Sequence, residues 1–282
     1  MNLQEMARRI KKGETDRLFF TDEVREEIAQ FSTEEIESRL EGYTRAPMIR
    51  KDSSDMQLSR VYHIFCWIEA LKQFSIGEDA RVVEVAPGGG THIVTAFDLI
   101  SGEKGKYVAF NLNKKLTSDL KSQTEDLNLD IRIIEDDAKN VLAYIPRETI
   151  DMVAGNHAIN DVLETIIANK EGLDTVEGDW FEIAPRLMRK YEKAYLNGTL
   201  RNLVFDDFID IMRAIYFTLK PRGYLVLNYC VYPIEIDWGG SVPVRSAFVN
   251  LARQWITEAD LGFEIVSLDG FDPKWWGFFR KY

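Results

Sequence analysis

Cysteine and histidine are scarce in this chain of 282 residues, which contains two cysteines and three histidines. Two cysteines far apart, Cys66 and Cys230, cannot build the dense disulfide framework of a small secreted domain. Because their neighbours are apolar, we expect buried free thiols in a reducing cytoplasm. No grouping of histidine, cysteine and acidic residues has the spacing of metal ligands, so the sequence predicts no metal site.

Long apolar runs and an excess of positive charge are also missing. No stretch approaches the roughly 20 apolar residues that a membrane-spanning helix needs, and residues 1–12 lack the apolar core of a signal peptide. Acidic residues outnumber basic ones by 46 to 35, which gives a net charge of −11. A basic stripe of the kind that binds nucleic acid is not visible. We therefore expect a cytoplasmic protein without a membrane or nucleic-acid partner.

The most informative segment runs from Arg81 to Gly90, with the sequence RVVEVAPGGG. Its apolar, β-branched residues predict a strand that is buried on both faces. Gly88 and Gly90 permit a sharp turn and the close approach of a ligand to the main chain. A helix expected over residues 91–100 points its free N–H groups into the same crevice. This order is typical of a site for a nucleotide-like ligand, although such a turn also occurs without a ligand.

These residues resemble the first motif of the class I S-adenosylmethionine-dependent methyltransferases, an acidic residue followed by three alternating glycines. Ala86 stands where the family has the first glycine. The dinucleotide-binding pattern is matched less well, because Ile93 stands at the place of its last glycine. The resemblance covers about residues 76–282. It implies S-adenosylmethionine as the cofactor, bound at Glu84, Ala86, Gly88, Gly89 and Gly90.

Two later strand ends continue the resemblance. A strand expected at residues 107–110 ends at Asn111, where the family usually has an acid that binds the ribose hydroxyls; an amide can still hydrogen-bond a hydroxyl. A strand expected at 131–134 leads into Asp136, Asp137 and Ala138. The resemblance implies that an acid of this group lies near the adenine amino group, with Asp137 as the better positional match. An aspartate here is also suited to capping a helix.

Strands and helices alternate from residue 76 onward, which predicts a parallel sheet. The expected fold is α/β, a Rossmann-like sheet of seven mostly parallel strands with helices on both faces. By the resemblance, the last strand is antiparallel, and Arg222 replaces a glycine in the turn before the fifth strand. Residues 1–75 are expected to form an N-terminal helical cap, and residues 162–204 a helical insertion in the domain at 76–282.

Candidate catalytic residues follow the fourth expected strand, in the segment GNHAIND at 155–161. Ligands of open α/β sheets bind at this edge, and we expect Asn156 to contact the cofactor there. His157 is suited to accept a proton near neutral pH, and Asp161, one helical turn further on, is suited to orient its ring. Alternatively, Asn160 or Asp161 caps a helix and His157 only lines the pocket.

Aromatic residues gather after the fifth expected strand. Tyr229, Tyr232 and Trp238 are suited to form a wall for an acceptor, or they pack in the core. Tyr229 is the third candidate catalytic residue. On the N-terminal side, Tyr62 and Trp67 are candidates for closing the site.

The combined pattern predicts an S-adenosylmethionine-dependent methyltransferase that acts on a small-molecule acceptor of unknown identity. One alternative is an aminopropyl or aminocarboxypropyl transferase on the same fold; Asn156 and His157 stand where such enzymes generally place acids, which argues against it. Another is a catalytically silent partner protein, which Ala86 and Asn111 favour. A homodimer is compatible with the sequence.

Overall fold

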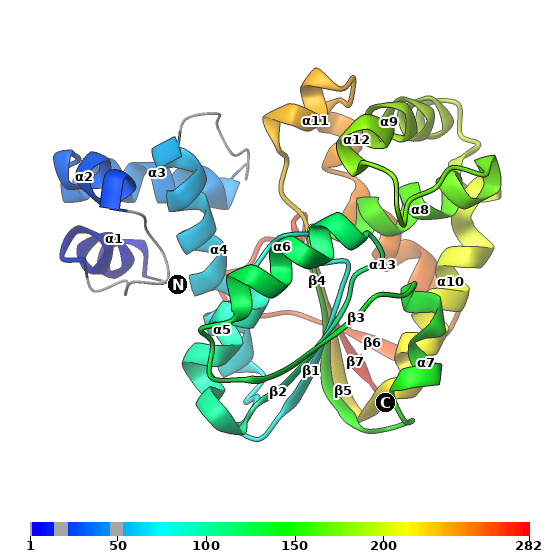
Figure 1. Ribbon diagram of the computed structural model, residues 1–282, viewed down its shortest axis with the longest axis horizontal. Coiled ribbons are helices and arrows are strands. Elements are labelled where there is room, and N and C mark those ends of the chain that lie inside the picture. The colour runs from blue at the N-terminus through cyan, green and yellow to red at the C-terminus, as the bar shows by residue number, and fades with distance from the viewer. Residues whose placement is uncertain (1, 14–21, 46–52) are drawn as a thin grey trace.

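A seven-stranded sheet forms the centre of the computed structural model, which describes residues 2–13, 22–45 and 53–282 (Figure 1). The strand order is β3-β2-β1-β4-β5-β7-β6. Neighbouring strands are parallel except at β7, which is antiparallel to both β5 and β6. This confirms the predicted fold class. The strands are β1 Arg81–Val85, β2 Lys106–Phe110, β3 Asp130–Ile134, β4 Ile150–Asn156, β5 Leu219–Asn228, β6 Phe263–Val266 and β7 Trp276–Lys281.

Helices cover both faces of the sheet (Figure 1). On one face lie α4 (Ser53–Gln73), α5 (His92–Ser101) and α6 (Lys114–Thr124). On the other lie α7 (Val141–Tyr144), α8 (Ile159–Glu171), α10 (Leu200–Thr218) and α13 (Phe248–Glu258). Beyond the carboxyl ends of the strands stand α9 (Trp180–Leu196), α11 (Pro233–Asp237) and α12 (Val242–Arg245), and two short 3-10 turns occur at Gly102–Lys104 and Ala138–Asn140.

The N-terminal part contains α1 (Leu3–Lys11), α2 (Asp22–Gln30) and α3 (Thr33–Arg45). Helix α3 begins with a reciprocal cap: the Ser32 hydroxyl accepts from the Glu35 N–H at 3.1 Å, and the Glu35 carboxylate accepts from the Ser32 N–H at 2.6 Å. Helix α1 packs on α3, and α3 packs on α4. The three helices therefore form a layer outside α4.

Helix α4 belongs to the core of the sheet as much as to the N-terminal helices. The Trp67 side chain is fully buried, and its ring centroid lies 5.1 Å from that of Trp276 on β7. Phe74, just after the helix, stacks on Tyr224 of β5 at 4.0 Å. A division of the chain at residue 75 would therefore pass through a shared core.

Both cysteines are free and buried, as the sequence predicts. Within the described ranges, no helix combines the length and the apolar character needed to cross a membrane.

Candidate functional site

A cavity of about 810 Å³ lies at the carboxyl ends of the central strands. Two much smaller hollows continue it along the edge of the sheet. The first shares Gly88 with the cavity and is lined by Asn111, and the second shares Ala86 with the first and is lined by Asp137. Asp161 lines all three spaces. The turns after β1, β2, β3 and β4 thus border a row of neighbouring hollows that share lining residues.

At the glycine turn after β1, the main chain borders these hollows without a side chain in between. Gly88 has φ +59°, and a Cβ added there would meet only a methyl carbon of Leu116 at 3.9 Å. Ala86 has φ 52°, the left-handed conformation that a glycine adopts without strain. The backbone at Ala86 therefore keeps the shape of the glycine that it replaces. Gly89 lines the large cavity, whereas the Gly90 N–H donates to the Pro87 carbonyl at 2.8 Å.

Asn111 holds the turn in place. Its side-chain N–H donates to the Gly88 carbonyl at 2.8 Å, while the residue lines the first small hollow. This use of the amide leaves the side-chain oxygen as the acceptor that a ligand hydroxyl can use. An aspartate at this position has no N–H to donate to Gly88, so the asparagine has a structural role that the sequence did not reveal.

Asp136 and Asp137 line the second small hollow together with Ala138. Asp136 accepts from the Tyr144 hydroxyl at 2.7 Å and from the Asn140 amide at 2.9 Å. Burial raises the pKa of Asp136, but these hydrogen bonds outweigh burial and hold it below its usual value. The Asp137 carboxylate accepts from the Lys139 N–H at 2.9 Å and caps the 3-10 turn at Ala138–Asn140, which confirms the predicted capping role.

Three predicted cofactor residues, Glu84, Gly90 and Asn156, are not among those that line the three spaces. Glu84 is only 1% exposed and accepts a hydrogen bond from the Tyr107 hydroxyl; burial raises its pKa to about 8 although this bond acts in the opposite direction. The Asn156 oxygen accepts from the Trp67 indole N–H at 2.9 Å, and its amide nitrogen lies 3.2 Å from Nδ1 of His92. These contacts join Glu84 of β1 to Tyr107 of β2, and they join Asn156 at the end of β4 to α4 and α5.

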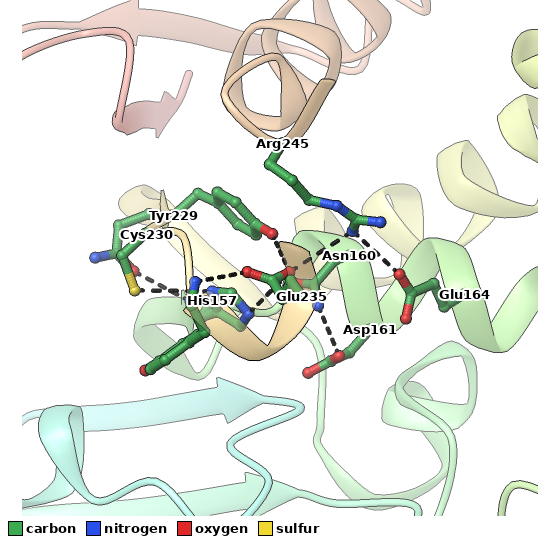
Figure 2. Close-up of polar contacts among 10 residues, drawn as sticks. His157, Asn160, Asp161, Glu164, Tyr229, Cys230, Glu235 and Arg245 are labelled. Carbon is green, nitrogen blue, oxygen red and sulfur yellow. Dashed lines mark hydrogen bonds and ion pairs between the residues drawn. The ribbon is translucent and has the colours of Figure 1, made fainter. Parts of the chain in front are cut away.

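His157 lines the cavity in a left-handed conformation, with φ 56°. Its ring stacks on Tyr229 with centroids 4.5 Å apart, and its Nε2 lies 3.7 Å from Oε1 of Glu235 (Figure 2). Burial lowers the pKa of His157, although the Glu235 carboxylate acts in the opposite direction. A neutral imidazole facing a cavity is able to accept a proton.

The predicted pairing of His157 with Asp161 is wrong, because the carboxylate beside His157 belongs to Glu235. Helix α8 begins at Ile159, so His157 precedes the helix and the spacing of a helical turn does not apply to it. Asp161 instead accepts from the Asn160 amide at 2.9 Å. The N-cap of α8 is Ala158, so neither Asn160 nor Asp161 caps this helix.

Behind the cavity lies a buried guanidinium, that of Arg245 on α12 (Figure 2). Its Nη1 lies 3.3 Å from Glu164 of α8 and 3.6 Å from Glu235 of α11. Glu235 also accepts from the Tyr229 hydroxyl at 2.5 Å and from the Tyr232 N–H at 2.8 Å. Asp161, Glu164 and Glu235 all line the cavity, and we call these three residues the acidic cluster.

The environment favours the protonated forms of part of this cluster. Burial, followed by the charges of Glu164 and Glu235, raises the pKa of Asp161 well above its usual value. Burial raises the pKa of Glu164 to about 7, against the effect of Arg245. Asp161 and Glu164 are therefore suited to hold protons at the cavity.

Aromatic and aliphatic side chains form the rest of the cavity wall. Tyr232 and Trp238 line it, as the sequence suggested, whereas Tyr229 is buried behind His157 and supports Glu235. Tyr62 and Trp67 are not in the lining, and Met56 of α4 reaches the cavity in their place. Sequence reasoning missed the lining residues Glu164, Trp180, Phe181, Met188 and Glu235.

In the part of the chain that the structure describes, no group of three or more histidine, cysteine, aspartate and glutamate side chains is arranged to hold a metal ion. No protein-family model and no curated protein matches this sequence.

Solved structures do resemble the chain in three dimensions. A methyltransferase from Aquifex aeolicus, described as dependent on S-adenosylmethionine, is 13% identical, with a TM-score of 0.46, and the alignment covers 86% of this chain and 96% of that one. TrmN from Thermus thermophilus is 16% identical, with a TM-score of 0.43, and the alignment covers 79% of this chain and 49% of that one, so this chain spans about half of its length. Fibrillarin from Methanococcus jannaschii, a pre-rRNA processing protein, is 15% identical, with a TM-score of 0.39 and coverage of 73% and 68%.

The sheet order, with β7 inserted antiparallel between β5 and β6, decides the fold. The chain has the class I methyltransferase fold. The similarity to these structures is a similarity of fold, and the chemistry of this protein depends on the residues of its own site.

Proposed function

We propose that the protein is an S-adenosylmethionine-dependent methyltransferase that acts on a small molecule. The observation that carries the proposal is the row of neighbouring hollows from Asp137 to His157, which passes the bare main chain of Gly88. The side chains along the row match the parts of such a donor in order. Asp136 and Asp137 offer acceptors for an amino group, Asn111 offers an amide oxygen for a hydroxyl, and Gly88 leaves room beside the main chain.

The bound donor supplies a methyl group on a positively charged sulfur. The protein holds the acceptor atom in line with this group, and positioning of this kind contributes on the order of 7–11 kcal/mol to lowering a barrier. His157 accepts a proton from the acceptor, because its imidazole is neutral and faces the cavity. Glu235 and Tyr229 fix the imidazole ring from two sides, so we describe them as positioning residues.

A small acceptor suits the shape and charge of the site. The cavity is walled by α8, α9 and α11, and its volume of about 810 Å³ is in the range of small-molecule sites. The net charge of −11 and the acidic lining oppose a phosphate backbone.

Titration calorimetry with S-adenosylhomocysteine tests the proposal. We expect saturable binding of one equivalent by the wild-type protein and by His157→Gln, because His157 faces the acceptor end. Methyl transfer, followed by mass spectrometry, should be about 10²–10⁴-fold slower in His157→Gln, and the slowdown should be largest above the pH at which the wild-type imidazole loses its proton, below its usual pKa near 6.5. A folded wild-type protein that binds neither S-adenosylmethionine nor S-adenosylhomocysteine would rule the function out.

One observation favours the aminopropyl or aminocarboxypropyl alternative. Although the loop after β4 contains no acid, Asp161 and Glu164 of α8 bring two carboxyl groups to the same cavity. Transfer of a longer group from a related sulfonium donor would use the same hollows. The mass added to the product separates the two reactions, since a methyl group adds far less than an aminopropyl group.

A further inference from the structure

The cavity is acidic on one wall and contains no permanent positive charge on its surface. Four carboxyl groups line it, those of Asp161, Glu164, Glu235 and Asp237. No lysine or arginine from residues 2–13, 22–45 or 53–282 belongs to the lining. Arg245 balances part of this charge from behind, but it is fully buried and is not itself part of the surface.

The same wall has more hydrogen-bond acceptors than donors. Asn160 is 4% exposed and lines the cavity, and its Oδ1 has no hydrogen-bond partner within the described part of the chain. One of its two amide N–H groups donates to Asp161. A buried acceptor without a donor is costly, so this oxygen indicates a ligand that carries N–H or O–H groups.

Charge distinguishes between these two kinds of donor. The acidic cluster contains three carboxyl groups and only one guanidinium, that of Arg245. A neutral hydroxyl would satisfy Asn160 but would bring no positive charge to Asp161, which forms no ion pair with Arg245. An ammonium group brings three N–H donors, no acceptor and a positive charge, and it therefore answers both deficits at once.

The remainder of the lining is suited to an apolar body. Trp180, Phe181 and Trp238 belong to it, and the rings of Phe181 and Trp238 lie 6.1 Å apart. Indole and phenyl faces bind apolar groups and also favour a nearby cation. A ligand with a basic group and an apolar body fits this combination of lining residues.

We infer that the acceptor is an amine on an apolar or aromatic body, with its nitrogen held by Asn160, Asp161 and Glu164. This inference rests on the proposed methyl transfer and names its substrate class. The bound ammonium first gives a proton to His157 or to a carboxylate of the cluster. The nitrogen lone pair then forms the new C–N bond while the C–S bond of the donor breaks and its electron pair stays on sulfur. The product leaves as a methylated ammonium, and the proton passes to solvent.

The donor also carries an ammonium, on its amino-acid end, and the experiment has to separate the two sources. S-adenosylhomocysteine contains this group, whereas 5′-methylthioadenosine lacks the whole amino-acid end. A carboxyl group that binds only the acceptor therefore leaves the affinity for both compounds unchanged. One that binds the donor affects S-adenosylhomocysteine alone.

The decisive measurement is calorimetry on protein saturated with S-adenosylhomocysteine. The probes are alkyl and aryl amines from butylamine to tryptamine, each paired with the alcohol and the carboxylic acid of the same shape. We expect the best amine to bind at least tenfold more tightly than its alcohol and its acid. Labelled S-adenosylmethionine should then give an N-methylated product with that amine.

Glu164→Gln is the main variant, because glutamine keeps the shape and can still accept from Arg245. It should lose the preference for amines by about tenfold while its affinity for S-adenosylhomocysteine stays unchanged. Asn160→Leu, which removes the unpartnered oxygen, is the second variant and should have the same effect. Glu182→Gln makes the same change of charge at an exposed position of α9 outside the lining, and it should keep the wild-type preference. Circular dichroism verifies the fold of each.

Three results would overturn the inference: equal binding of amines and alcohols, binding of no amine in the panel, or a Glu164→Gln variant that is weakened for S-adenosylhomocysteine but not for 5′-methylthioadenosine. The last result would assign the cluster to the donor. A wild-type protein that fails to bind S-adenosylhomocysteine contradicts the proposed function instead, and amine titrations of the free protein would then decide the inference alone.

Discussion

The two ends of the row of hollows are built in different ways. The end near Asp137 takes its predicted cofactor residues from the first residues after β1, β2 and β3, although α8 also lines it, and most polar groups of these turns are hydrogen-bonded to the main chain or to near neighbours in sequence. The end near His157, which we propose as the acceptor end, is assembled from α8, α11 and α12, and its central ion pair joins residues 81 positions apart, Glu164 and Arg245. The polar groups of the first end belong mainly to local turns, whereas those of the second depend on tertiary packing.

This difference has a consequence for stability. A local turn is stabilised by its own backbone bonds, so a substitution there alters ligand binding more than folding. A buried charge cluster between distant segments is stable only while each charge keeps its partner. We expect the strongest effects on folding at the acceptor end and the strongest effects on donor binding at the other end.

Arg245→Met should produce the largest change in stability. It leaves Glu164 and Glu235 buried without their cation, and we expect the free energy of unfolding to fall by about 3–5 kcal/mol in urea titrations. The control is Arg201→Met, which breaks the exposed pair with Glu258 at 2.6 Å and should cost less than about 1 kcal/mol. Equal losses in the two variants would contradict a special role for the buried cluster.

Gly88→Val should produce the largest change in donor binding. Valine is strained at φ +59°, and its side chain would fill the space between the turn and Leu116. Calorimetry with S-adenosylhomocysteine should show a loss of about 100-fold or more, which corresponds to about 2.7 kcal/mol. Gly172→Val is the matched control, because Gly172 has φ +67° outside the hollows, and its strain should lower stability while donor affinity is retained. A Gly88→Val protein that binds normally would refute the site.

Glu84→Gln tests the buried carboxyl group beneath the glycine turn. Because burial raises the pKa of Glu84 to about 8, the folded protein keeps a proton that the unfolded chain loses near pH 4.5. The contribution of Glu84 to stability is present below that pH and decreases by at most about 1.4 kcal/mol per pH unit up to about pH 8.

Glutamine has no such titration, so the variant should gain stability relative to the wild type as the pH rises from 5 to 8, measured by urea unfolding. The control Glu78→Gln, on an exposed pair with Lys104, should keep the wild-type pH dependence. Parallel pH profiles for Glu84→Gln and the wild type would show that Glu84 ionises normally.

Ala86→Gly should have the smallest effect. It relieves the left-handed conformation at φ 52° but adds freedom to the unfolded chain, so stability should rise by up to about 1 kcal/mol. Arg222, at φ 65°, offers the same test in the turn before the main part of β5. Thermal unfolding of Ala86→Gly and Arg222→Gly measures both. A loss of stability at Ala86 would show that its methyl group packs usefully in the turn.

The strand ends that border the small hollows could be predicted because their sequence signals are local. Apolar runs in the sequence indicated β1, β2 and β3. The residues that follow these strands line the two small hollows. Ala86 and Arg222, which stand where the family has glycines, both have a positive φ, the conformation that glycine adopts without strain. The seven mostly parallel strands followed from the alternation of strands and helices together with the resemblance.

The acceptor end could not be predicted in the same way. Nothing in the spacing of Glu164, Glu235 and Arg245 indicates that α8, α11 and α12 meet. The error at His157 has a single cause: β4 ends at Asn156, and His157, with its positive φ, lies before the start of α8 at Ile159, so a helical spacing to Asp161 does not exist. A sharp turn between His157 and Ile159 leaves no trace in the pattern of apolar residues.

The hydrogen bond from Trp67 to Asn156 has a practical consequence for anyone who shortens this protein. A fragment that starts at residue 76 would lose the donor for Asn156 and would expose Trp276 and Tyr224 to water, so it should aggregate. A fragment that starts at residue 53 keeps α4 and should stay folded. Because the fragment keeps all six tryptophans, the difference in fluorescence between it and its Trp67→Phe variant would report whether Trp67 remains enclosed.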